Sequence, residues 1–251
     1  MRVAAIYDIH ANLPALEAVL RDIRQARVDQ IVVGGDVVPG PMSPETIACL
    51  LDLDIPALFI QGNGDREVVS QMSGIETDWF RTAPEQWREP VRSSAQQLDA
   101  EHARLIAGWP KTVSLEIPWI GEVLFCHATP RNDTEMFTRQ TPEAALLPVF
   151  AGVGAPVVVC GHTHMQFDRM IGKTRVVNAG SVGMPFGDPG AYWLLLGPDV
   201  QLRHTQYDLA KAAERIRRSR YPQAEDFAAR NVLHPPSEAA SLEAFARVEI
   251  K

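Results

Sequence analysis

Seven side chains that can bind a metal ion follow short apolar runs, at five separate places in this sequence. Such runs are typical of buried strands, and residues that follow parallel strands meet at one edge of a sheet. Carboxylate, amide and imidazole groups together suit a divalent metal of borderline hardness, so Mn, Fe, Zn and Ni all fit. The sequence therefore predicts one metal site, whose candidate ligands are Asp8, His10, Asp36, Asn63, His127, His162 and His164.

Two of these places carry two candidate ligands each, separated by one residue: Asp8 with His10, and His162 with His164. In an extended segment, residues i and i+2 face the same side, so each pair is expected to point at one region of space. A single Asp or His after a strand is ordinarily a solvated turn residue. Seven such residues in one consistent pattern favour a shared site instead.

The elements that must position these residues alternate as in α/β proteins. Strand, helix and strand patterns follow one another over residues 1–65, and the polar stretch 67–109 is expected to form helices on one side. A helix is expected to begin near Thr141, and a helical tail near Asp208. Later strands are expected at 113–117 and 122–126, as a hairpin, and at 157–160, 175–178 and 192–196.

Composition limits the classes of protein to which the chain can belong. It has 251 residues, 46% of them hydrophobic, which is enough for one large core, so we expect a single domain over residues 1–251. The 24 Lys and Arg against 31 Asp and Glu give a net charge of −7, which disfavours duplex nucleic acid or an anionic membrane as partner. Three widely spaced cysteines and the lack of a signal-peptide or membrane-span pattern predict a cytoplasmic protein.

The motifs that contain the candidate ligands resemble those of the calcineurin-like metallophosphoesterase superfamily, in its bacterial phosphodiesterase-like branch. They are, in order, Asp8-x-His10, Gly35-Asp36, Gly62-Asn63-x-Asp65, a strand-terminal His127 and Gly161-His162-x-His164. The similarity spans about residues 1–204, and the segment 178–183 (Asn-Ala-Gly-Ser-Val-Gly) is similar to one in bacterial members. The resemblance implies a four-layer α-β-β-α sandwich of two mixed sheets flanked by helices.

The resemblance also implies two divalent metal ions and a role for each ligand. Asp8, His10, Asp36 and His164 would hold one ion, and Asp36, Asn63, His127 and His162 the other, with Asp36 bridging them. A hydroxide between two such metals would attack phosphorus directly, with Asp36, Asn63 and His127 as the catalytic set. The implied function is a metal-dependent phosphoesterase acting on a small-molecule phosphoester.

One position departs from the family pattern. Many members have a His directly after the motif Asn, where it protonates the leaving oxygen, whereas this chain has Gly64. Either another group such as His102 replaces it, or the leaving group departs with little help. The second possibility favours leaving groups of low pKa, as in phosphoanhydrides of nucleotides or aryl phosphodiesters, over simple alkyl monoesters, and a nucleotide-type phosphodiester or dinucleoside polyphosphate is the first expectation for the substrate. The alternatives are a phosphomonoesterase, including one that acts on phosphoproteins, and a non-catalytic scaffold of the same fold, which the seven filled ligand positions disfavour.

Several residues near the motifs have two interpretations. Arg66 and Arg131 are candidates for binding the substrate phosphate, because Arg can bind phosphate through two donors, and a structural ion pair is the alternative for each. Asp65 is expected to orient its loop or to pair with a neighbouring Arg. His204 and His234 are expected at the surface. The tail is expected to pack on the core, with a homodimer contact as the alternative.

Overall fold

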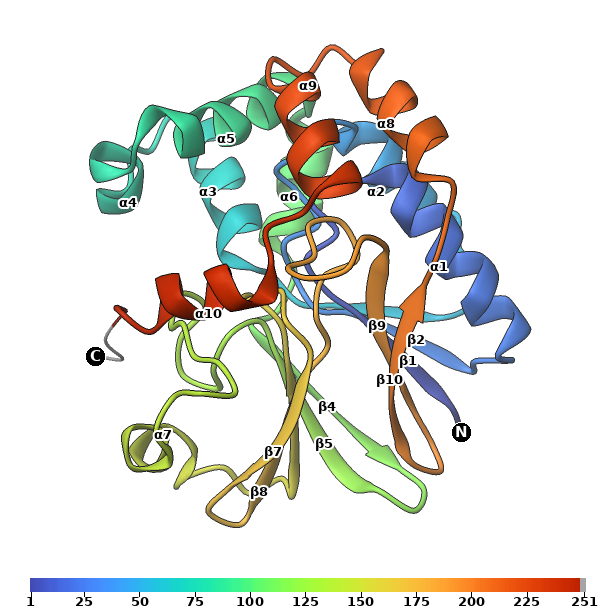
Figure 1. Cartoon of the computed structure of the whole chain (residues 1–251), viewed down its shortest axis with the longest axis vertical. Coiled ribbons are helices and arrows are strands. Elements are labelled where there is room, and N and C mark those ends of the chain that lie inside the picture. The colour runs from blue at the N-terminus through green and yellow to red at the C-terminus, as the bar shows by residue number, and fades with distance from the viewer. Residues whose placement is uncertain (249–251) are drawn as a thin grey trace.

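The computed structural model describes residues 1–248 and contains two five-stranded sheets packed face to face (Figure 1). In the first sheet, β1, β2 and β3 are parallel, and β9 and β10 extend it in antiparallel fashion beyond β1. Its strands, in spatial order, are β10 (Val200–Thr205), β9 (Ala191–Leu196), β1 (Val3–Ile6), β2 (Gln30–Val33) and β3 (Ala57–Phe59).

The second sheet has a similar construction, with parallel strands β5, β6 and β8 and an antiparallel strand at each edge. Its strands, in spatial order, are β4 (Thr112–Ile117), β5 (Gly121–Cys126), β6 (Val157–Cys160), β8 (Thr174–Asn178) and β7 (Phe167–Ile171). Both sheets are therefore mixed, and the parallel strands of each end at the same edge of the sandwich.

Alternating side chains build three hydrophobic layers, as the two-residue period of a strand requires. On β1, Val3 and Ala5 point between the sheets, whereas Ala4 and Ile6 pack against the helices on the outer face. The helices on that face are α1 (Leu13–Gln25), α2 (Ser43–Leu51), α3 (Asn63–Met72), α4 (Asp78–Thr82), α5 (Glu85–Gln97) and α6 (Ala100–Ala107). Helix α7 (Glu143–Phe150) covers the second sheet, so the predicted four-layer fold is confirmed.

The tail, which begins after β10, is described up to residue 248. It contains α8 (Leu209–Arg217), α9 (Ala224–Phe227), the π-helix η1 (Ala228–Leu233) and α10 (Glu238–Phe245). Ala212, Ala213 and Ile216 of α8 are buried in a cluster with α9 and η1. The chain then turns back across the molecule, so that α10 lies apart from the other tail helices and above α7 in Figure 1.

Two strands were not predicted, β7 and β10. Both lie at sheet edges and expose every second residue, such as Asp168 and Leu202, so neither forms the continuous apolar run of a central strand. Within residues 1–248, no helix is long and apolar enough to cross a bilayer.

Candidate metal centre

The structure brings all seven predicted ligands together at the edge where the parallel strands end. Each comes within four residues of the end of β1, β2, β3, β5 or β6, which is the convergence that the apolar runs predict. Their donor atoms form two groups, within each of which the atoms lie within 4.8 Å of one another. The first group is Asp8, His10 and His164, and the second is Asp36, His127 and His162, with Asn63 beside His127.

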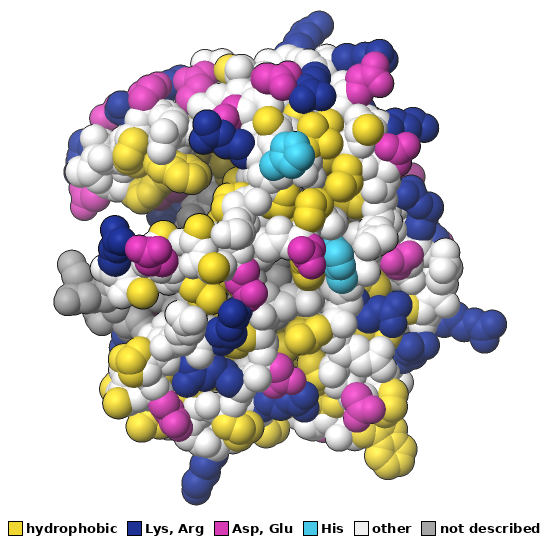
Figure 2. All heavy atoms as spheres, viewed as in Figure 1, with side chains coloured by type: hydrophobic (Ala, Val, Ile, Leu, Met, Phe, Trp, Pro, Cys, Tyr) yellow, Lys and Arg dark blue, Asp and Glu magenta, His cyan; other side chains and the backbone are white. Residues whose placement is uncertain are grey.

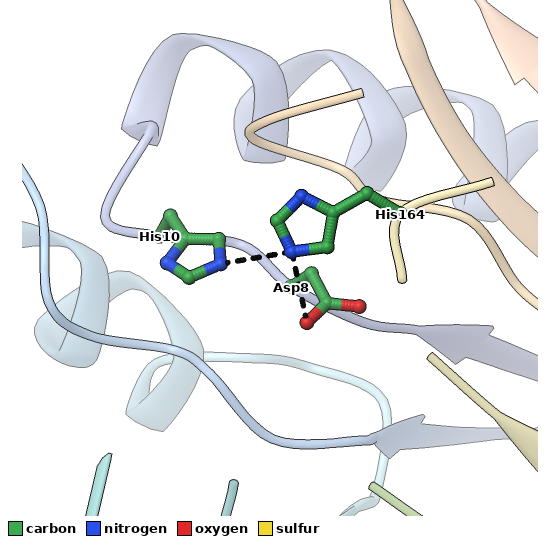
Figure 3. Close-up of side chains that lie close together, drawn as sticks. All are labelled: Asp8, His10 and His164. Atoms are coloured by element: carbon green, nitrogen blue, oxygen red, sulfur yellow. Dashed lines mark hydrogen bonds and ion pairs between the residues drawn. The ribbon is translucent and has the colours of Figure 1, made fainter. Parts of the chain in front are cut away.

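The first group holds two imidazole nitrogens face to face (Figure 3). Nε2 of His10 lies 3.2 Å from Nε2 of His164, which lies 3.4 Å from Oδ1 of Asp8. Each Nδ1 faces a backbone carbonyl, that of Pro39 at 3.3 Å and that of Met184 at 2.7 Å, and so carries the hydrogen. Both Nε2 atoms therefore direct lone pairs at the same point. These lone pairs repel each other unless a cation or a proton lies between them.

The second group has the same character. Nδ1 of His127 donates to the carbonyl of Gly34 at 3.0 Å, which leaves the Nε2 lone pair 3.0 Å from the Asn63 amide oxygen and 3.6 Å from Oδ1 of Asp36. If the Asn63 amide turned over, its nitrogen would donate to His127 Nε2 and to His162 Nδ1, each at 3.0 Å. With its oxygen directed at the histidines, the Asn63 amide can bind a cation that lies among these atoms. With its nitrogen there, the amide instead forms hydrogen bonds directly to the two histidines.

Asp36 lies between the two groups. Its Oδ1 is directed at His127, and its Oδ2 lies 3.8 Å from Nε2 of His10. Asp8 is fully buried, and its Oδ1 has no hydrogen-bond partner among the described residues, although its Oδ2 accepts the backbone N–H of His162 at 2.8 Å. Buried carboxylate oxygens and imidazole lone pairs that lie side by side are typical ligands of a divalent metal ion. The side chains present therefore fit two metal ions.

The pKa values of Asp8 and of the histidine ligands depend on their burial and on the charges of their neighbours. Burial alone would raise the pKa of Asp8, but His164, with smaller contributions from His127 and His10, holds it well below its usual range. Burial lowers the pKa of His10, and burial with the charge of His127 lowers that of His162 to about 4. For His127 and His164, burial is outweighed by the carboxylates, chiefly Asp36 and Asp8 respectively, and the pKa is raised. Each group thus combines one easily protonated imidazole with one that resists protonation.

Five of the seven ligands have left-handed backbone conformations. The φ angles are 52° at Asp8, 46° at His10, 48° at Asp36, 66° at His162 and 59° at His164. Such conformations cost a non-glycine residue about 1 kcal/mol or more and concentrate at functional sites. The loops brace one another here, because the N–H groups of Asp8 and His10 donate to the carbonyls of Gly35 and Asp36.

The prediction that each pair points at one region from an extended segment is wrong for the two-histidine motif. His162 lies in the second group and His164 in the first. The left-handed turns at both residues rotate the two side chains apart, which the two-residue spacing alone does not reveal. Asp8 and His10 do share a group, although their backbone is also left-handed rather than extended.

The segment 178–183 clamps the loops that carry the ligands, a role that the sequence analysis missed although it singled the segment out. Ser181 Oγ and the Gly183 N–H both donate to the carbonyl of Asp8, at 2.7 and 3.0 Å. Asn178 donates to the carbonyl of Gly161 at 2.6 Å. A Cβ on Gly183 would lie 1.8 Å from the carbonyl oxygen of Ile9, so only glycine allows this close approach.

Position 64 has no room for the side chain that many family members carry there. The Gly64 N–H donates to Oδ1 of Asp36 at 2.7 Å, and a Cβ would lie 2.7 Å from Cδ of Pro39. His102 does not replace that side chain, because it lies at the N-terminus of α6, where its Nδ1 is 2.8 Å from the carboxylate of Asp99. It lines a separate pocket with Leu51 and Leu105.

Asp65 orients its loop and does not pair with Arg. It is fully buried, and its two oxygens accept the N–H groups of Val38 and Gly62, each at 3.0 Å. Burial, together with the charge of Asp36, raises its pKa to about 8. His204 and His234 are exposed and lie outside the two groups, as predicted.

Both arginines that were candidates for phosphate binding contact carboxylates. Arg66 donates from Nε and Nη2 to Asp133, at 2.8 and 3.2 Å, and from Nη1 to Glu67 at 2.8 Å. Partial burial would raise the pKa of Asp133, but Arg66 holds it below its usual range. Arg131 donates from Nε to Glu135 at 3.0 Å. Their role toward substrate stays a prediction.

Known proteins resemble this chain in sequence and in fold. An uncharacterized protein of Methanocaldococcus jannaschii is 25% identical over 240 residues, which cover 88% of this chain and 94% of that protein. The crystal structure of a metallophosphoesterase from Sphaerobacter thermophilus has a TM-score of 0.70 and 27% identity, covering 91% of this chain and 97% of that one. A hypothetical protein of Pyrococcus horikoshii has the same fold, with a TM-score of 0.76, 20% identity, and coverage of 94% and 99%.

The match to a family model is the most direct of these findings. Residues 1–197 match the model of the calcineurin-like phosphoesterase superfamily domain, which includes all seven predicted ligands and the clamping segment 178–183. Residues 198–248, outside the matched region, contain the edge strand β10 and the helices that follow it. The chain belongs to the calcineurin-like phosphoesterase superfamily.

Proposed function

We propose that this protein is a binuclear metal-dependent phosphoesterase that cleaves phosphodiester or phosphoanhydride bonds, in small substrates of nucleotide type. The observation that carries the proposal is the pair of ligand groups that meet at Asp36, in which buried imidazole and carboxylate acceptors face one another, and in which Oδ1 of Asp8 and Nε2 of His162 have no hydrogen-bond partner among the described residues. Structural ion pairs alone do not require such an arrangement, because buried acceptors are normally matched with donors.

The chain's own residues would bind and position both ions. Asp8, His10 and His164 would hold one, Asn63, His127 and His162 the other, and Asp36 would contact both, as in the family pattern. When bound, divalent metals supply Lewis acidity toward phosphoryl oxygens and lower the pKa of a coordinated water. Two dications against the carboxylates of Asp8 and Asp36 leave a net charge of about +2, which would attract phosphate to an otherwise acidic protein.

The position next to Asn63 supports activated leaving groups. No side chain at Gly64 can donate a proton, and His102 is bound to Asp99 elsewhere. A leaving oxygen of low pKa needs little protonation, so aryl phosphodiesters and phosphoanhydrides of nucleotides would react faster than simple alkyl monoesters. Acidic and basic side chains are interspersed on the face shown in Figure 2, without a large basic patch there, which agrees with a small substrate rather than duplex nucleic acid.

The test is hydrolysis of bis(4-nitrophenyl) phosphate and 4-nitrophenyl phosphate by metal-free protein and by protein supplied with Mn, Fe, Zn or Ni. We expect turnover only with metal, two ions bound per chain, and a faster reaction with the diester. A faster reaction with the monoester would favour the phosphomonoesterase alternative. Bound metal without turnover on any ester would favour the non-catalytic scaffold.

A series of aryl phosphodiesters tests the proposed lack of acid assistance. We expect the rate to rise steeply as the pKa of the leaving phenol falls, because negative charge on its oxygen is not neutralised by a proton. A flat dependence with chemistry rate-limiting would show that another group supplies the proton.

A single domain over residues 1–251, a cytoplasmic location and a homodimer stay predictions from the sequence.

A further inference from the structure

A pocket of ≈ 390 Å³ opens beside the first ligand group. His164 forms part of its wall, so a phosphate bound at the metal centre would be next to it. Another part of the wall is made by the tail, which lies outside the region matched by the family model. The lining residues are His164, Gln166, Phe186, Gly187, Asp188, Tyr192, Pro235, Ser237 and Glu238.

Specific contacts hold the tail in this place. The Gly187 N–H donates to the carbonyl of Pro236 at 2.9 Å, and Arg139 forms an ion pair with Glu238. The Phe186 ring stacks on the His164 ring, with centroids 5.0 Å apart, and the Phe245 ring of α10 packs against Phe186 at 6.0 Å. A chain of ring contacts thus runs from α10 to a predicted metal ligand.

The charged groups that line the pocket, apart from His164, are both acidic. Asp188 is exposed, and Glu238 has 40% of its side chain exposed, whereas no Lys or Arg is among the lining residues. The amide nitrogen of Gln166 donates to three backbone carbonyls, those of Ala179, Trp193 and Arg203. Its amide oxygen is therefore the atom that can accept a hydrogen bond from a ligand. The pocket therefore offers acceptors to a ligand that can donate.

The N-terminus of α10 does not reverse this preference. Helix N-termini attract anions through free N–H groups and the helix dipole. Here the Ser237 side chain accepts the Ala240 N–H, and Glu238 occupies the first turn. These two side chains compensate the positive end of the helix, and a second phosphate in the pocket would face the carboxylate of Asp188 and that of Glu238, which is paired with Arg139.

We propose that this pocket binds a cationic, hydrogen-bond-donating arm of the substrate, such as an alkylamine attached through the phosphoester, and that the tail segment 235–238 selects it. This inference rests on the proposed function, since the phosphate is taken to lie at the metal centre. It favours phosphodiesters with an amine-bearing arm over phosphoanhydrides, whose neighbouring phosphate would be repelled.

The test uses non-hydrolysable ligands, so that binding is measured whether or not the protein turns over any ester. Calorimetry would compare 3-aminopropylphosphonate, 3-carboxypropylphosphonate and the neutral propylphosphonate on the Mn-loaded full chain. We expect the amine to bind about fivefold more tightly than propylphosphonate, as one partly exposed charge pair allows, and the carboxylate more weakly than propylphosphonate. Equal affinities, a preference for the carboxylate, or no binding of any of them would overturn the inference.

Substitutions that change one charge at a time show which residues cause the preference for the amine. Asp188→Asn and Glu238→Gln should each reduce the amine preference toward equal binding. Arg139→Gln should increase it, because Glu238 loses its partner and becomes available to the ligand. Glu122→Gln is the matched control, since Glu122 is exposed near the turn of the β4–β5 hairpin, at the other end of β5 from His127.

The variants separate a binding role from a structural one. A tail that only stabilises the fold would give Glu238→Gln and Arg139→Gln the same effect, because both remove the same ion pair, and this result would overturn the inference. Metal content measured on each variant shows whether the centre is intact. If the amine preference is found but no ester is hydrolysed, the proposed function fails while the pocket stands as a binding site.

Discussion

The two ligand groups use similar side chains but are held to different degrees. In the first, both histidines have Nδ1 on a backbone carbonyl, and the carbonyl of Asp8 accepts two hydrogen bonds from the clamping segment 178–183. In the second, only His127 is oriented in this way. His162 has a buried Nε2 without a hydrogen-bond partner among the described residues, and Asn63 contributes a neutral amide. Because pre-oriented ligands lose less entropy on binding, we expect the first group to bind its metal more tightly.

Asp36 is the residue whose loss would affect both groups at once, because one of its oxygens faces each group. We expect Asp36→Asn to weaken both metals and to lower kcat/KM for bis(4-nitrophenyl) phosphate by about a thousandfold, as the loss of several kcal/mol of transition-state stabilisation implies. Metal analysis and steady-state kinetics measure the two effects. Glu122→Gln is the control for charge removal, and retention of both ions with near-normal turnover in Asp36→Asn would contradict the proposed bridging role.

Replacing one histidine of the two-histidine motif at a time would separate the groups. We expect a Mn titration of the intact protein to show a tight and a weak step. His164→Ala should remove the tight step and His162→Ala the weak one, each lowering affinity by at least about a hundredfold, since second-shell changes alone reach that range. Loss of the same step in both variants would mean that the groups do not bind metals independently.

The clamping segment allows a smaller change that acts on the first group alone. Ser181 Oγ donates to the carbonyl of Asp8 and accepts the N–H of Met184, whose carbonyl in turn orients His164. We expect Ser181→Ala to weaken the tight Mn step about tenfold and to leave the weak step unchanged. Titration calorimetry would measure both steps. Ser114→Ala, at an exposed position on β4, is a control that should change neither, and equal weakening of both steps by Ser181→Ala would refute a selective clamp.

Where the ligands meet could be predicted because central parallel strands are continuous apolar runs, and the residue after each run lies at one edge of the sheet. Which group each ligand joins could not be derived from spacing. That depends on left-handed turns at His162 and His164, which follow from packing between loops; the family resemblance alone indicated the division. The path of the tail was also beyond prediction, since the contact of Phe245 with Phe186 joins residues distant in sequence without any local pattern.

Substitution of Arg66 has the smallest expected effect, and it tests the second group, whose ligands are oriented by fewer hydrogen bonds. All three of its donor nitrogens are engaged, two with Asp133 and one with Glu67, so the structure favours the ion-pair interpretation over a free phosphate clamp. We expect Arg66→Gln to lower the free energy of unfolding by about 1 kcal/mol, the usual value for a partly exposed pair, with KM changed less than about threefold. Denaturant unfolding and steady-state kinetics would measure these quantities.

Arg131→Gln is the matched comparison, because Arg131 also binds a carboxylate, that of Glu135, but does so on the loop after His127. A rise in KM of more than about tenfold in either variant, at unchanged stability, would assign that arginine to the substrate phosphate, since one charged hydrogen bond to a ligand has an effect of this size. If only the Arg66 variant also weakens the second Mn step, the Arg66–Asp133 pair braces the loops around Asn63. The second group would then depend on support from side chains where the first depends on backbone carbonyls.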